Sequence, residues 1–246
     1  MPIGGRQRQT AGKNARPAAL AAMGEGSALK NVRIWFEKKD TARYISHLDL
    51  NRCMSRAFHK TRLHLWYTQG FNPHVFVSFA MPLSLGMDGL RECMDVRLLE
   101  EMDKETLIEK LNGALPLDIH VYDVTEPVMA THEIAFAHYE ISYDPDPVPA
   151  GEAEKILRDV MGREELIVEK HTKKGPKDFN LAPYLTDWSL KTEEGRLHLS
   201  ITLPIGLSGG VNPSLVKSAA EKYGGLTLFD RTARTCLYNE KMEPYR

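Results

Sequence analysis

The order of predicted strands and helices occurs twice along the 246-residue chain, and this repetition limits the fold more than any other feature. In each half a strand precedes an amphipathic helix, further strands, a second helix and a last strand. The repeat is one of element order and not of residues, since the two halves share no common motif. It predicts two structural units of the same kind in tandem.

The first half shows the pattern most clearly in its first strand and first helix. Val32, Ile34 and Phe36 alternate with Arg33 and Trp35, which is the period of a half-buried strand. From Ser46, a helix-capping residue, apolar residues recur at helical spacing. This helix is expected to end near residue 62. The other predicted elements are a helix at 104–111 and strands at 63–67, 75–79, 93–99 and 117–124, of which 63–67 and 75–79 form either two strands or one broken by a loop.

The second half repeats this order after a proline-containing joint near residues 127–132. Its predicted elements are strands at 134–143, 166–170, 188–192, 197–203 and 233–238 and helices at 152–161 and 213–224. The order β-α-β-β-α-β is typical of a ferredoxin-like unit, an antiparallel sheet with two helices on one face. We therefore predict an α+β fold with two tandem ferredoxin-like units, over residues 31–126 and 133–240. Residues 1–30 are expected to form a disordered basic tail, because they contain little to bury.

Charge and cysteine content limit the classes of function. The 32 Lys and Arg residues balance 33 Asp and Glu residues, so any attraction to nucleic acid must be local. Cys53, Cys93 and Cys236 lack the spacing of a zinc site and the clustered thiolates of an iron-sulfur site. The sparse cysteines suit a reducing compartment, and no apolar run is long enough to span a bilayer. We expect a cytoplasmic protein that has no membrane partner and binds no metal or cofactor of its own.

A local concentration of positive charge lies on the first predicted helix. Arg52, Arg56 and Lys60 recur every four residues, opposite the apolar stripe. Guanidinium groups bond phosphate oxygens in pairs, so this face is a candidate binding surface, and a solvated helix face is the alternative. His47 and Asp49 at the helix start are candidates for ligand contact, although capping alone explains Asp49.

The loop after this helix is the least generic stretch of the sequence. It combines a glycine with free backbone geometry, a proline that restricts its neighbour, an aromatic ring and an imidazole. Its candidate binding residues are Gln69, Gly70, Phe71, Asn72, Pro73 and His74. Without a partner carboxylate or nucleophile in view, the loop favours binding over catalysis, and whether the chain is an enzyme stays open.

Four motifs resemble those of the radical-SAM-linked family, whose members occur alone or fused to the C-terminus of radical SAM proteins. They are RYISHLDL at 43–50, QGFNPH at 69–74, SFA at 78–80 and PLSLG at 82–86. Two departures are visible: Val75 stands where the family has a second proline, and Gly89-Leu90-Arg91 precedes Glu92 where the family has a serine-containing loop.

This resemblance implies an accessory or substrate-presenting protein that works with a separately encoded radical SAM enzyme. The partner, and not this chain, would carry the iron-sulfur cluster and S-adenosylmethionine. An alternative is an RNA-binding or RNA-processing protein, because tandem ferredoxin-like units with a basic helix are similar to the fold of CRISPR repeat-RNA endoribonucleases. In either case we expect the basic helix face and the 69–74 loop to meet in one concavity.

Overall fold

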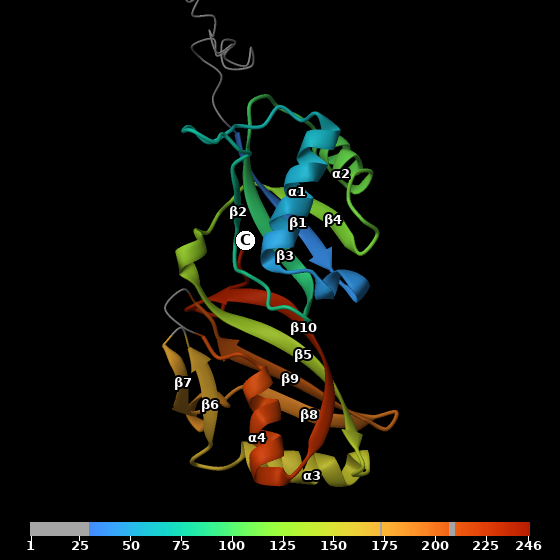
Figure 1. Ribbon diagram of the computed structural model, residues 1–246, viewed down its shortest axis with the longest axis vertical. Coiled ribbons are helices and arrows are strands. Elements are labelled where there is room, and N and C mark those ends of the chain that lie inside the picture. Colours follow the sequence, from blue (N-terminus) through green and yellow to red (C-terminus); the bar gives the residue numbers. More distant parts are fainter. Residues whose placement is uncertain (1–29, 173, 207–209) are drawn as a thin grey trace, which may run out of the picture.

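The computed structural model describes residues 30–172, 174–206 and 210–246. The predicted basic tail lies outside the described residues except for Lys30, which begins the first strand. The chain has a mixed α+β fold in which a mostly antiparallel sheet carries the helices (Figure 1). None of the helices in the described ranges is long and apolar enough to cross a membrane.

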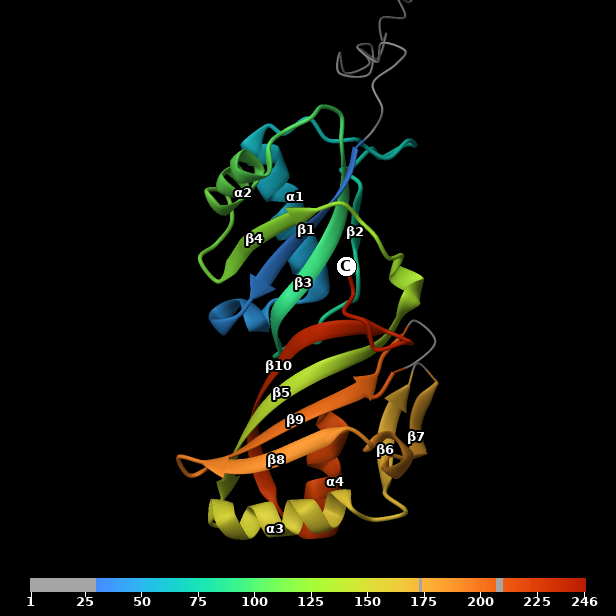
Figure 2. The same cartoon turned by 180° about the vertical axis from the view of Figure 1, so that it is seen from behind.

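The first half forms one end of the sheet. Its elements are β1 (Lys30–Lys38), α1 (His47–Thr61), β2 (Val77–Phe79), β3 (Asp88–Leu98), α2 (Lys104–Asn112) and β4 (Ile119–Thr125). The strands lie in the order β4-β1-β3, and β2 pairs with the end of β3. Both helices lie on one face, and Figure 2 shows the opposite face with these strands in front.

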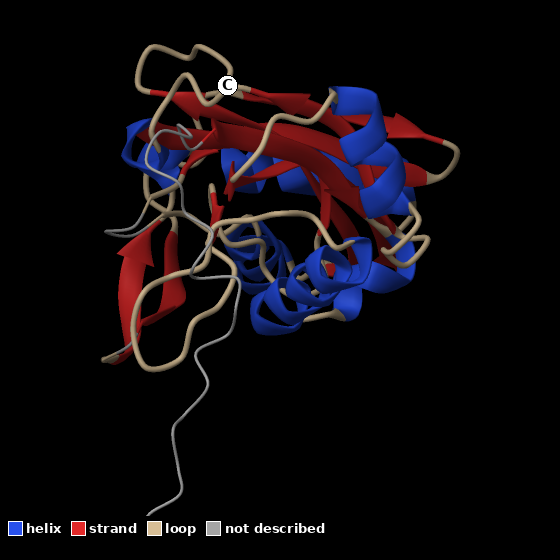
Figure 3. Cartoon of the chain, turned by 90° about the horizontal axis from the view of Figure 1, so that it is seen from above, coloured by secondary structure: helices blue, strands red, loops and turns tan. Residues whose placement is uncertain are grey.

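The second half forms the other end of the sheet, with strand order β10-β5-β9-β8. Its elements are β5 (Ile134–Asp146), α3 (Ala150–Met161), β6 (Ile167–Thr172), β7 (Gly175–Asn180), β8 (Trp188–Glu193), β9 (Arg196–Pro204), α4 (Ser214–Gly224) and β10 (Thr227–Asn239). The strands β6 and β7 form a separate two-stranded sheet, which stands apart from the main sheet when the molecule is seen from above (Figure 3).

The two halves share one continuous sheet, whereas the sequence predicts two separate antiparallel sheets. β10 pairs in parallel with β3, through Ala233 opposite Asp88 and Arg234 opposite Gly89. Because β2 has only three residues, it leaves the start of β3 with an unpaired edge. β10 has 13 residues and is long enough to satisfy those backbone groups.

Two further elements, residues 63–67 and β1, also differ from the prediction. Residues 63–67 form no strand but two isolated bridges, from Leu65 to Leu98 and from Tyr67 to Val75. β1 is buried on both faces, since Arg33 and Trp35 are covered as completely as the apolar face. The chain end provides this cover, because the Tyr245 ring packs edge-on against Trp35 and beneath the Arg33 guanidinium.

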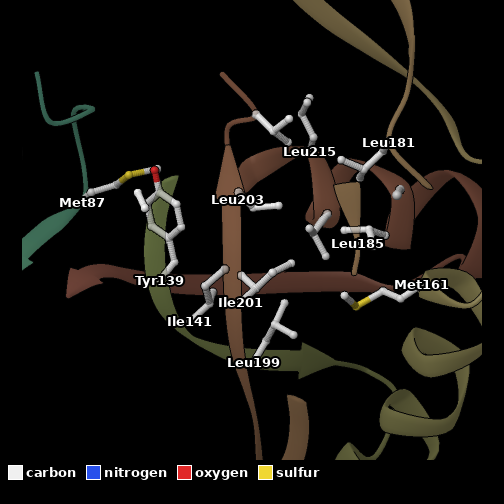
Figure 4. Close-up of a cluster of buried hydrophobic side chains, with 14 of the residues drawn as sticks. Met87, Tyr139, Ile141, Met161, Leu181, Leu185, Leu199, Ile201, Leu203 and Leu215 are labelled. Carbon is white, nitrogen blue, oxygen red and sulfur yellow. The ribbon is translucent and has the colours of Figure 1, made fainter. Parts of the chain in front are cut away.

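The buried hydrophobic residues form two clusters, one between the sheet and the helices of the first half, and one that fills the second half and continues to Trp35 and Cys93 on the helix-free face of the first half. The core of the second half extends to the loop that follows β2. Figure 4 shows Met87 from that loop beside Tyr139 on β5. This packing and the β3–β10 pairing hold the loop at 80–87 between the two halves.

Candidate functional site

The motif segments 43–50, 78–80 and 82–86 gather at the start of α1, where the two halves of the protein meet. The Gly86 N–H donates a hydrogen bond to the Arg43 carbonyl over 2.9 Å. Asn212, just before α4, donates from Nδ2 to Ser84 Oγ over 3.5 Å. Segments that are far apart in the sequence therefore form one surface. The loop at 80–87 lies in this surface and contacts both halves of the protein.

A buried ion pair fixes this loop. Arg234 on β10 is 2% exposed and donates from Nε and Nη2 to the two carboxylate oxygens of Glu92, over 2.9 and 2.6 Å. Its guanidinium also donates to the carbonyls of Met81 (3.0 Å) and Pro82 (3.1 Å). A two-bonded guanidinium pair has strict geometry, so a side chain of the second half sets the position of a first-half loop.

A second buried network lies beside the first. Asp88 Oδ2 accepts hydrogen bonds from Arg43 (2.7 Å) and Arg231 (3.0 Å). Lys38 is buried as well and donates to the Arg43 carbonyl over 3.3 Å. Burial lowers the pKa of Lys38, and the nearby Glu92 charge opposes this shift. These side chains support the segment at 40–44, and a buried network of this kind is expected to keep that segment rigid.

His47, the first residue of α1, lies near the buried Arg234–Glu92 pair. Its ring packs edge-on against Phe79, with 4.9 Å between ring centroids. Partial burial lowers the pKa of His47, and the Arg234 charge lowers it further. The imidazole is therefore neutral at neutral pH. Among the described residues no group of three His, Cys, Asp or Glu side chains is placed to hold a metal ion.

The lowered pKa of His47 predicts a pH-dependent contribution to stability. Its ordinary value is 6.5, and folding favours the neutral form, so this contribution is present above about pH 6.5 and is lost as the pH falls through the lower folded-state pKa. We expect His47→Gln to lose less stability than the wild type between about pH 7.5 and 5, as measured by urea unfolding. His120→Gln, at an exposed position on β4, is the control and should behave as the wild type. Equal acid sensitivity of all three proteins would contradict the prediction.

Ser46 caps the helix, and Asp49 supports this cap from the third helical position. The Asp49 N–H donates to Ser46 Oγ over 3.1 Å, and the Ser46 hydroxyl donates back to the Asp49 carboxylate over 2.7 Å. The serine bond lowers the pKa of Asp49, and Arg52, which donates to it over 3.1 Å, lowers it further. Arg52 and Arg56 otherwise face solvent along α1.

The loop at 69–74 projects from the molecule. Phe71 is fully exposed, which excludes a place for its ring in the core. Thr68 organises the loop: its N–H bonds the His74 carbonyl (2.8 Å), and its hydroxyl accepts from the His74 N–H (3.2 Å) and contacts His74 Nδ1 (3.1 Å). Gly70 has a φ of 143°, a geometry that favours glycine.

The structure places the sequence-predicted residues at two ends of one helix. The loop lies beside the C-terminal end of α1, because Tyr67 Oη is 3.3 Å from His59 Nδ1. His47 lies 12 residues earlier, about 18 Å along the helix axis. Arg52 and Arg56 lie between these ends on the exposed side. The exposed side of α1 forms a strip that runs from Leu48 past Arg52 and Arg56 to the 69–74 loop, and His47 lies beside the start of this strip, packed on Phe79. That the basic side of α1 and the loop share one concavity stays a prediction.

Sequence reasoning missed three exposed apolar side chains at the start of this strip. Tyr44 is 71% exposed, Leu48 59% and Leu85 65%. A signal for Leu48 was available, since it stands outside the apolar stripe of α1. No such signal existed for Glu92 and Arg234, because 142 residues separate them. We call Tyr44, His47, Leu48 and Leu85 the motif surface.

Fold and site together define an α+β protein with a rigid, partly apolar surface at the junction of its halves. The chain belongs to the family described as "Uncharacterized protein conserved in bacteria (DUF2344)", whose model matches residues 31–214. No curated protein matches the chain. The crystal structure of an unknown protein from Galdieria sulphuraria is similar over 83% of this chain and 99% of that chain, at 11% identity. The TM-score for this pair of structures is 0.26.

Proposed function

We propose that this chain is an accessory protein that docks onto a separately encoded radical SAM enzyme through the motif surface. The observation that carries the proposal is the exposure of Tyr44, Leu48 and Leu85 on a surface braced by buried ion pairs. Exposed apolar side chains in a rigid frame lose little entropy on binding and are suited to the centre of an interface. Segments 43–50 and 82–86 resemble motifs of the radical-SAM-linked family, and this resemblance is the reason for proposing a radical SAM enzyme as the partner.

The rest of the α1 strip would form the rim of the interface. A stable interface covers about 800 Å² on each partner, which is large enough to include both ends of α1. Arg52 and Arg56 would then speed association with an acidic partner, and the 69–74 loop would contact it at the far end. In this arrangement Asp49 keeps its role in support of the Ser46 cap.

The cysteines indicate which of the two proteins would hold the cofactors. Cys93 and Cys236 are buried, and burial raises the pKa of the Cys93 thiol, which opposes the thiolate form that ligates iron. We therefore assign the iron-sulfur cluster and S-adenosylmethionine to the partner, and no catalytic residue to this chain. Three free cysteines suit the reducing cytoplasm, where we place the complex.

We also propose that the two halves are tandem ferredoxin-like units fused through one sheet. The orders β4-β1-β3-β2 and β10-β5-β9-β8 are equivalent when each half is numbered alone. The β6–β7 hairpin would then be an insertion in the second unit. This interpretation supports a role in presentation, because each unit exposes loops that join its strands and helices.

Co-purification tests the main proposal. A tagged copy of this chain is expected to retain the radical SAM enzyme encoded beside it at physiological salt, and deletion of the chain should lower the yield of that enzyme's product. A tagged copy of an unrelated α+β protein is the control. The proposal fails if the two proteins do not associate and the enzyme makes its product equally well without this chain.

A second candidate function is RNA binding, which one observation favours: Arg52, Arg56 and Lys60 are exposed along α1 towards the fully exposed Phe71. Two phosphate contacts from the arginines would contribute about 1.4 to the slope of log affinity against log salt for single-stranded RNA. Arg52→Ala with Arg56→Ala should remove that contribution. Flat or absent RNA affinity at low salt would exclude this function.

A further inference from the structure

The helices of the first half leave one face of its strands free (Figure 2). A cavity of about 310 Å³ lies on this face. This volume is at the lower end of the range for small-molecule sites, so a single ring system is the size of ligand that suits it. The lining side chains used below come from β1, β3, β4 and the segment after β4; they are Trp35, Arg91, Tyr122, Asp123, Thr125 and Glu126.

Two aromatic side chains line this cavity, the buried Trp35 and the more exposed Tyr122, and only Tyr122 offers a ring for stacking. The Trp35 ring is fixed, because its Nε1–H donates to Thr125 Oγ1 over 2.9 Å and its ring meets Tyr245 edge-on. Tyr122 is 42% exposed and presents its ring to solvent. Aromatic rings of this kind stack on nucleobases, and each stacked base contributes about 1–3 kcal/mol to binding.

The charged side chains of the cavity differ in whether they have strong hydrogen-bond or ion-pair partners within the protein. The Arg91 guanidinium lies 4.9 Å from the Trp35 ring centroid, and its hydrogen bonds to Cys236 Sγ and the Tyr245 carbonyl are both 3.5 Å long. No carboxylate within the described ranges pairs with Arg91, and none of the described residues pairs with Glu126. Asp123 differs, because Lys104 binds it. The cavity therefore offers donors from Arg91 and from Arg246, which also lines it, and one acceptor group, the Glu126 carboxylate, beside the Tyr122 ring.

We infer that this cavity binds a single nucleobase, with guanine preferred. Guanine presents the acceptors O6 and N7 to a guanidinium and carries N–H donors on its opposite edge, which a carboxylate accepts. Arg91 and Glu126 match these two edges, and Tyr122 supplies the stacking face. The site goes beyond the docking proposal and lies on the other face of the sheet from α1. If RNA is a ligand of this chain, this is where one of its bases would bind.

Titration with the four ribonucleoside monophosphates tests the inference. The protein has three tryptophans, so a Trp66→Phe, Trp188→Phe variant reports on Trp35 fluorescence alone. We expect saturable quenching by GMP and weaker binding of AMP, CMP and UMP. Tyr122→Ala should weaken GMP binding about fivefold or more, whereas Tyr122→Phe should retain it. Glu126→Gln should reduce the preference for GMP over AMP.

The control variant is Tyr184→Ala, at an exposed tyrosine of the second half, and it should bind GMP as the parent does. Absence of saturable binding for all four nucleotides at millimolar concentration would overturn the inference. Unchanged GMP affinity in Tyr122→Ala would overturn it as well, because the nucleotide would then bind elsewhere. Enzyme association should not change in Tyr122→Ala, so failure here is distinguishable from failure of the docking proposal.

Discussion

Arg234→Met is expected to lower the free energy of unfolding by about 3–5 kcal/mol, which is the usual cost of leaving one member of a buried ion pair alone. Arg234 is 2% exposed, and the substitution strands the Glu92 carboxylate and the carbonyls of Met81 and Pro82. Urea unfolding measures the change. Arg196→Met is the control: its side chain is 56% exposed and pairs with Asp144, which is 52% exposed, so a loss of about 0–1 kcal/mol is expected.

A double variant separates loss of the pair from loss of packing. In Glu92→Leu with Arg234→Met the buried charge is absent, so much of the stability lost in Arg234→Met should return. The double variant would still lack the bonds to the loop at 80–87, and we expect it to dock more weakly than the wild type. If Arg234→Met costs no more than Arg196→Met, the ion pair does not hold this loop.

Leu48→Asp is expected to weaken association with the proposed radical SAM partner about 30-fold or more, since a central interface residue contributes about 2 kcal/mol or more. Leu48 is the second residue of α1, where a carboxylate is favourable to the helix. Its exposed side chain makes the expected change in unfolding free energy smaller than about 0.5 kcal/mol. The loss therefore cannot come from an unfolded helix.

Leu117→Asp is the matched control, because Leu117 is also exposed and lies in the loop before β4. Biolayer interferometry with the immobilised enzyme gives both dissociation constants. Leu117→Asp should bind as the wild type does. Equal affinities for the two variants would remove Leu48 from the interface.

The sequence predicts those features that depend on neighbours along the chain. The apolar stripe of α1 and its Ser46 cap are found as predicted, because helical spacing and capping are local properties. The start of β3 at Asp88 was missed, since Gly89 and the charged residues after it carry no strand pattern. Burial of Trp35 was missed as well, because its cover comes from Tyr245 at the far end of the chain.

In the candidate site, too, only the features that depend on neighbours along the chain could be predicted. Exposure of the 69–74 loop follows from its glycine and proline, and the basic side of α1 follows from its spacing. The motif surface does not, because the Arg234–Glu92 pair and the parallel pairing of β3 with β10 depend on tertiary structure. Side chains that local pattern assigns to solvent, such as Arg43 and Lys38, are buried there by partners that the sequence does not reveal.

Hydrogen exchange of this chain, alone and in complex with the radical SAM enzyme, tests most directly whether the motif surface is the docking site. Binding is expected to slow exchange of the amides at 44–48 and 84–87, with smaller changes at 69–74 and none around Tyr122. Protection confined to the Tyr122 face or to the β6–β7 hairpin, with residues 44–48 unchanged, would contradict this docking site.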